Sequence, residues 1–168
     1  MFEPIARTEP IPSDPAIYSG VSVQLSEPAA RFSLRARDLQ LLARILDRKI
    51  PERIGESIGG IACLGPDELY ARLPAGTALS SGDGQPVSIT EISERALGIV
   101  VEGARAIETL SAGCPLDLSG FSIGQTKRTI FETVEIIVSR EAETRFHVEV
   151  WRSFAPWLWQ ALCTAARE

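Results

Sequence analysis

The C-terminal part of the chain constrains the fold most strongly, because it reads as a β-strand followed by an amphipathic helix. In the segment Arg145–Trp151, apolar and polar side chains alternate, so that one face is apolar and the other carries His147, Glu149 and Trp151. Beyond Ser153, apolar residues recur at helical spacing: Phe154, Trp157, Leu158, Ala161, Leu162 and Ala165. We expect Ser153 to cap this helix and Pro156 to lie in its first turn, where the missing N–H is harmless. A helix with so wide an apolar stripe must pack on a sheet.

Upstream segments also alternate between strand and helix patterns. The expected strands are Arg31–Ala36, Ile58–Leu64, Val87–Ile92, Leu97–Val101 and Thr129–Arg140, the last forming a hairpin with Arg145–Trp151 across residues 141–144. A helix is expected after Asp38, its N-cap, and another over Gly103–Leu110, with Gly113 as C-cap; residues 74–86 are a loop. This order predicts an α+β fold, ferredoxin-like, with a mostly antiparallel sheet and helices packed on one face.

The chain divides into a short arm and one folded domain. Four prolines among residues 1–20 disfavour a helix or a central strand there, so we expect an extended proline-rich arm. This arm is either a flexible tail or a segment that orders on a partner through apolar anchors, namely Phe2, Ile5, Ile11, Ile17 and Tyr18. Residues 21–168 are expected to form a single domain, with two related halves split near residue 80 as the alternative.

Bulk properties exclude several classes of partner. A net charge of −5 and the lack of a basic-and-aromatic strip argue against nucleic acid. Apolar stretches such as Leu97–Val101 are far too short to cross a membrane. The N-terminal residues lack the basic start and apolar block of a signal peptide, and Cys63, Cys114 and Cys163 form no closely spaced pair, so a cytoplasmic protein with reduced thiols is expected.

Catalytic and cofactor motifs are not evident. The only histidine, His147, lies in mid-strand and is expected at a surface or interface; metal sites usually need three or four ligands. Neither GxGxxG nor GxxxxGK[ST] occurs. Glu132 and Glu135 should face opposite sides of a strand, while Glu141 and Glu143 should lie in a solvated turn. We therefore expect no catalytic residue, cofactor or metal in this chain.

Two arginines and two tryptophans remain as interface candidates. Arg128 and Arg152 border the last hairpin and are expected to pair with Asp117, Glu132 or Glu149, or else to contact an anion. Trp151 and Trp159 fall outside the predicted core faces. Exposed tryptophan and arginine are enriched in interface hot spots, so these residues indicate a protein partner.

Several motifs in the same region resemble one protein family. The first motif is Leu64-Gly65-Pro66-Asp67-Glu68, which is followed by Leu69-Tyr70 where the family has Trp-Leu. The second is Gly113-Cys114-Pro115-Leu116-Asp117-Leu118, followed by Phe121, Gly124 and Arg128-Thr129. The last is Trp151-Arg152-Ser153-Phe154-Ala155. Together they resemble the gamma subunit of heterotetrameric sarcosine oxidase over residues 30–166. The resemblance adds Thr129, Ser153 and Phe154 to the interface candidates Arg128, Trp151, Arg152 and Trp159.

The resemblance implies a fold of the aminomethyltransferase folate-domain type and a non-catalytic role in assembly. In that family the complex oxidises sarcosine to glycine and forms 5,10-methylenetetrahydrofolate and hydrogen peroxide. FAD and FMN are then expected on the beta subunit, NAD and tetrahydrofolate on alpha, and zinc on delta, with alpha as the main contact of this chain. Two alternatives stay open: a stand-alone tetrahydrofolate-binding module, and the gamma subunit of a related N-methylglutamate-type dehydrogenase.

Overall fold

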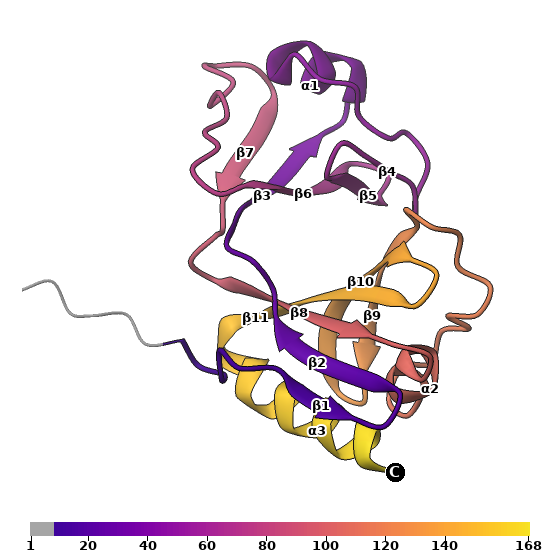
Figure 1. Cartoon of the computed structure of the whole chain (residues 1–168). Helices are drawn as coiled ribbons and strands as arrows, with labels where there is room; N and C mark the ends of the chain where they lie inside the picture. The colour runs from indigo at the N-terminus through magenta and orange to yellow at the C-terminus, as the bar shows by residue number, and fades with distance from the viewer. Residues whose placement is uncertain (1–8) are drawn as a thin grey trace, which may run out of the picture.

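The computed structural model describes residues 9–168, which fold into two antiparallel sheets and three α-helices (Figure 1). The six-stranded sheet has the order β1-β2-β8-β11-β10-β9. Its strands are β1 (Ala16–Tyr18), β2 (Val21–Leu25), β8 (Ala96–Glu102), β9 (Thr126–Phe131), β10 (Val134–Ala142) and β11 (Arg145–Trp151). The long strands β8, β11 and β10 form its centre.

The second sheet has five strands in the order β4-β5-β6-β3-β7. They are β3 (Ala29–Ala36), β4 (Ser57–Ile58), β5 (Ile61–Gly65), β6 (Glu68–Pro74) and β7 (Val87–Glu91). The helices are α1 (Leu39–Leu46), α2 (Ala106–Ser111) and α3 (Ala155–Arg167), and a 3-10 turn, η1 (Arg152–Phe154), precedes α3. The chain leaves the six-stranded sheet after β2, builds the second sheet, and returns at β8.

Each sheet packs its own helices and has its own apolar core. Phe146, Val148 and Val150 of β11 meet Leu158 and Leu162 of α3 beneath the six-stranded sheet, as the alternation of this strand predicts. Leu34 of β3 meets Leu42 and Leu46 of α1 on the outer face of the other sheet. Helices thus cover one face of each sheet, and the two remaining faces meet in the middle of the molecule (Figure 1).

Local signals placed several elements correctly. The carboxylate of Asp38 accepts hydrogen bonds from the backbone N–H groups of Gln40 and Leu41, so it is the N-cap of α1. The strand predictions Arg31–Ala36, Val87–Ile92 and Leu97–Val101 correspond to β3, β7 and β8.

Other expectations were wrong. One sheet was expected and two are present among residues 9–168. The segment Ile58–Leu64 is two strands, β4 and β5, because Gly59 and Gly60 both have positive φ and turn the chain between them. Thr129–Arg140 is likewise split by a two-residue turn at Glu132, so that β9 and β10 form a second hairpin.

The phase of the C-terminal helix also differs from the prediction. The 3-10 turn η1 delays the start of α3, so Ser153 does not cap the helix, whereas Pro156 does lie in its first turn. As a result Phe154 is 49% and Trp157 39% exposed, while Trp159, expected outside the core, is only 8% exposed. The interface role predicted for Trp159 therefore has no exposed indole to support it.

Gly113 does not cap α2, because the C-cap Ala112 is right-handed. Its small size is required instead by the Phe131 ring, which lies 2.6 Å from where a Cβ would stand.

The described part of the N-terminal arm packs against the domain. Ile11 is buried in the core of the six-stranded sheet, and the Glu9 carboxylate lies 3.1 Å from the Arg152 guanidinium. Ile17 is 74% exposed, and Phe2 and Ile5 lie outside the described residues. Within residues 9–168, none of the helices has the length and apolar character needed to span a membrane.

Candidate functional site

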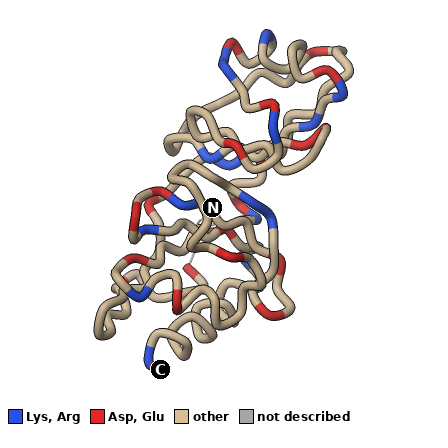
Figure 2. Tube along the Cα trace, turned by 90° about the vertical axis from the view of Figure 1, so that its right-hand side faces the viewer, with Lys and Arg blue, Asp and Glu red and all other residues tan. Residues whose placement is uncertain are grey.

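A chain of buried charges joins the two sheets. Arg31 of β3 donates from Nε to Glu149 Oε2 of β11 at 2.7 Å, and His147 Nε2 lies 2.6 Å from Glu149 Oε1. Arg31, His147 and Glu149 are 5%, 1% and 4% exposed. Figure 2 shows basic and acidic positions together where the sheets meet. Alternation in β11 thus separates an apolar face from a charged face, and both faces are buried.

The hydrogen bonds of His147 fix its tautomer. Its Nδ1 lies 3.1 Å from Nη1 of Arg72, and a guanidinium can only donate, so Nδ1 is the acceptor. Nε2 then carries the proton and donates to Glu149, which makes the ring neutral. The prediction that His147 lies at a surface or interface was wrong, because β11 is covered on both faces within this chain and the side chain is buried.

Glu141 is a member of the same network. Its carboxylate binds Arg72 of β6, and Nε of Arg145 donates to it at 3.0 Å. It is therefore not the solvated turn residue that the sequence indicated, since β10 continues to Ala142.

Glu149 carries a testable pH dependence. Burial acts to raise its pKa, but the hydrogen bond from His147 and the charge and hydrogen bond of Arg31 act in the opposite direction and hold the pKa below its usual 4.5. Because the folded-state pKa is depressed, the stabilisation is complete above about pH 4.5 and is lost as the pH falls toward 2. In urea titrations, the difference in unfolding free energy between wild type and Glu149→Gln should therefore shrink over this window. A difference that stays constant from pH 7 to pH 2 would contradict the assignment.

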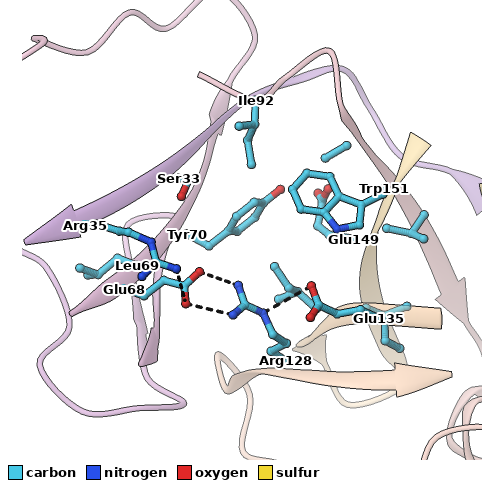
Figure 3. Close-up of a pocket in the computed structure, with 14 residues that line it drawn as sticks. Ser33, Arg35, Glu68, Leu69, Tyr70, Ile92, Arg128, Glu135, Glu149 and Trp151 are labelled. Carbon is cyan, nitrogen blue, oxygen red and sulfur yellow. Dashed lines mark hydrogen bonds and ion pairs between the residues drawn. The ribbon is translucent and has the colours of Figure 1, made fainter. Parts of the chain in front are cut away.

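Beside this network the sheets enclose a cavity of about 310 Å³. Its wall includes Arg35, Tyr70, Arg128, Glu149 and Trp151 (Figure 3). At the mouth, the two Nη atoms of Arg128 donate to the Glu68 carboxylate at 2.9 and 2.6 Å. The chemistry of the wall is therefore mixed, with two aromatic rings, one buried carboxylate and a paired set of surface charges.

The partner of Arg128 was not predicted from sequence. It is Glu68, with Glu135 at 3.7 Å, rather than Asp117, Glu132 or Glu149. The hydrogen bond from Arg128 lowers the pKa of Glu68. Asp117 accepts from the Ser119 backbone N–H at 3.1 Å, a local turn contact.

This partly exposed bidentate pair should contribute modestly to stability. A double-mutant cycle of Arg128→Ala and Glu68→Ala in urea should give a coupling energy of about 1 kcal/mol, reduced by high salt. The exposed pair of Arg53 and Glu56, 3.9 Å apart, is the control and should show weaker coupling. Equal coupling energies for the two pairs would contradict the view that the Arg128–Glu68 pair links the two sheets more strongly than an ordinary surface ion pair does.

The Tyr70 hydroxyl lines this cavity and is buried, and it makes no hydrogen bond of good geometry with a described residue. The residue is 7% exposed, and its ring points the hydroxyl toward Trp151 and Glu149 (Figure 3). Burial, followed by the Glu149 charge, raises the pKa of Tyr70, so the hydroxyl stays protonated. The Glu149 carboxylate is the acceptor that this hydroxyl faces.

The sequence-predicted residues only partly come together. Arg128 and Trp151 both line the cavity, and Trp151 is 40% exposed, as expected for an indole outside the core. Arg152, Ser153 and Phe154 follow in η1. Thr129 lies opposite Ile136, toward the helix-covered face of the sheet, and Trp159 is in the core, so these two are remote from the cavity.

Sequence reasoning missed Tyr70, Glu68 and the buried role of Glu149. Among residues 9–168, no group of three or more His, Cys, Asp or Glu side chains is arranged to hold a metal ion.

Comparisons with known proteins identify the fold. Neither a protein-family model nor a curated protein matches the sequence. A chain of the heterotetrameric sarcosine oxidase from Corynebacterium sp. U-96, solved in complex with pyrrole 2-carboxylate, superposes with a TM-score of 0.80 and 22% identity, covering 90% of this chain and 86% of that one. The glycine cleavage system aminomethyltransferase T from Bartonella henselae gives a TM-score of 0.67 and 12% identity, with 85% of this chain covering 45% of that protein. The chain thus has an α+β fold shared with a chain of a sarcosine oxidase and with part of an aminomethyltransferase.

Proposed function

We propose that this chain is a non-catalytic, gamma-type subunit of a sarcosine-oxidase-type complex. The observation that carries the proposal is the similarity to a chain of heterotetrameric sarcosine oxidase over nearly the full length of both chains. The motifs around Gly113–Leu118 and Trp151–Ala155 support the same assignment. The role in this proposal is assembly, and the exposed aromatic side chains of Trp151 and Phe154 support it.

The chemistry then belongs to the partner subunits. In this proposal a cytoplasmic complex demethylates sarcosine to glycine and forms 5,10-methylenetetrahydrofolate and hydrogen peroxide. FAD, FMN, NAD, zinc and tetrahydrofolate are bound by the beta, alpha and delta subunits, and this chain contacts alpha most extensively.

The exposed aromatic residues at the β11–α3 junction are the surface that assembly would cover. Trp151 and Phe154 are 40% and 49% exposed and lie three residues apart, on either side of Arg152 and Ser153. Large aromatic side chains contribute strongly to association when a partner desolvates them. Losing both should weaken the complex more than losing an exposed aliphatic residue elsewhere.

The proposal is tested on the native complex. An affinity-tagged copy of this chain, expressed in its own host, should co-purify with three partner subunits and with sarcosine-dependent peroxide formation. Deleting the chain should abolish the assembled complex, and the wild-type chain should restore it. Trp151→Ala/Phe154→Ala should restore it poorly, whereas Ile123→Ala, at a side chain that is 66% exposed, should restore it fully. A stable and active complex that lacks this chain would contradict the proposal.

A second candidate is a stand-alone tetrahydrofolate-binding module. The similarity to an aminomethyltransferase and the cavity between the sheets favour it. Calorimetric titration of the isolated chain with tetrahydrofolate decides this point, because an assembly subunit should give no binding heat. If the complex forms but oxidises N-methylglutamate in preference to sarcosine, the chain is the equivalent subunit of that dehydrogenase.

A further inference from the structure

A groove runs along α3, separate from the cavity between the sheets. It has a volume of about 390 Å³ and lies where α3 passes the C-terminal end of α2 and the turn between β9 and β10. The α3 side of the groove includes Trp157, Ala161 and Ala165, which follow one another on successive turns of the helix. The helix therefore buries one face in the core and leaves a second, partly apolar strip uncovered.

The charge of this groove has one sign. Glu132 and Glu168 line it, and among the described residues of its wall there is no lysine, arginine or histidine. Neither carboxylate forms an ion pair with any residue in the range 9–168. An indole face and carboxylates both attract a cation, whereas they give no attraction for nucleic acid or anionic lipid. The groove is therefore complementary to a basic side chain.

The backbone holds Glu132 beside the groove in a conformation that favours glycine. Its φ is 51°, and it is one of three residues other than glycine with positive φ in the described part of the chain. The Glu132 N–H donates to the Gly113 carbonyl oxygen at 2.7 Å, which fixes the turn against the end of α2. Glycine would adopt this backbone more easily, so the glutamate side chain is kept at a cost in stability.

The groove also continues the surface assigned to assembly. Phe154, which belongs to that surface, precedes Trp157 by three residues at the start of α3, and both side chains are partly exposed. Residues three apart in helical geometry lie on the same side, so the two aromatic rings form one strip that leads into the groove. A partner that covers Trp151 and Phe154 would reach the groove next.

We propose that the groove along α3 receives a basic side chain, lysine or arginine, from a partner subunit. The cation lies between the Glu132 carboxylate and the Trp157 indole. Its aliphatic stem packs on Ala161 and Ala165, which offer no competing charge. This inference rests on the proposed assembly role and adds the chemistry that the partner must present.

The test is a competition in the native host. Wild-type and variant full-length chains, carrying different tags, are expressed together in cells that lack the natural copy, and the partner subunits that co-purify with each are compared. Glu132→Lys should retain about tenfold fewer partner subunits than wild type, because it places like charges together. Glu143→Lys is the matched control, since it makes the same charge change in the turn at the other end of β10 and should retain them fully.

Glu132→Gly separates binding from folding. Because glycine adopts positive φ without strain, this variant of the isolated chain should unfold at a higher urea concentration than wild type. It should nevertheless lose partner subunits in the competition, which misfolding cannot explain. The groove assignment is overturned if Glu132→Lys or Glu132→Gly retains partners like wild type, or if Glu143→Lys loses as many. A wild-type chain that captures no partner subunits would overturn the assembly role as well, so the two failures are distinct.

Discussion

Replacing Glu149 by alanine should lower the free energy of unfolding by about 3–5 kcal/mol. The substitution leaves the Arg31 guanidinium, of which 7% of the side chain is exposed, without its charged partner. It also removes the acceptor of the His147 Nε2–H group, which is then unsatisfied at 1% exposure. The loss combines an uncompensated buried charge with an unpaired buried donor, so it should exceed that of any single exposed ion pair in the chain.

Urea denaturation monitored by circular dichroism measures the loss. Glu108→Ala is the matched control, because Glu108 pairs with Arg105 at 3.0 Å on the surface, where the loss of an ion pair should have little effect on stability. The double variant Arg31→Met/Glu149→Leu should recover most of the stability, since it removes both charges and keeps apolar volume. If Glu149→Ala were as mild as Glu108→Ala, the buried network would not hold the sheets together.

Much of the secondary structure could be predicted because it depends on local pattern. The alternation Phe32, Leu34, Ala36 follows from one face of β3 packing on α1, and the Asp38 cap is set within three residues of chain. Strand β6 was missed although Leu69, Ala71 and Leu73 alternate with Glu68, Tyr70 and Arg72, the pattern of a strand with one apolar face. The polar residues on its inner face pair with the six-stranded sheet opposite, which periodicity cannot reveal.

The phase error in α3 has a similar origin. Phe154 starts an apolar series that fits helical spacing, and sequence alone does not show that η1 inserts a tighter turn before the helix. The shift moves Ala155, Trp159 and Cys163 into the core and leaves Trp157 partly exposed. Position relative to the sheet, and not the apolar spacing by itself, decided which aromatic residues are exposed.

The site was harder to predict than the fold because its contacts are distant in sequence. Arg128 meets Glu68 across 60 positions, and Arg31 meets Glu149 across 118. The motifs singled out Arg128 and Trp151 but gave no indication that Tyr70 would share a cavity with them. Both aromatic residues come to one place only because the chain builds a complete second sheet between β2 and β8.

This insertion explains why the middle of the molecule is polar. The apolar face of each sheet is buried by its own helices. The inner faces can therefore carry charged residues that pair between the two sheets. Arg31–Glu149, Arg72–Glu141 and Arg128–Glu68 each join one sheet to the other. Such contacts fix how the sheets face each other and leave space for a cavity, which an apolar interface would have filled.

The close approach of β8 to this network makes Gly98 indispensable. Gly98 lies opposite Glu149 in the pairing of β8 with β11. A Cβ at this position would stand 2.5 Å from Cε1 and 2.7 Å from Nε2 of His147, and it would also collide with the Ser26 hydroxyl. The His147 ring cannot move away without breaking its contacts to Glu149 and Arg72. Gly98→Ala should therefore cost about 2–3 kcal/mol of unfolding free energy, through overpacking in a central strand.

Gly65→Ala is the control for this substitution. Gly65 also lies in a strand, but the nearest atom to its added Cβ is Glu68 Cβ at 3.6 Å, an ordinary contact, so its stability should change by less than about 0.5 kcal/mol. Urea denaturation compares the two variants, and the NMR signal of the His147 ring reports on displacement of the imidazole. A Gly98→Ala protein as stable as wild type, with an unchanged His147 signal, would show that the ring does not lie over β8. The neutral imidazole could then no longer be the link between Glu149 and Arg72 on which the charged contact between the sheets depends.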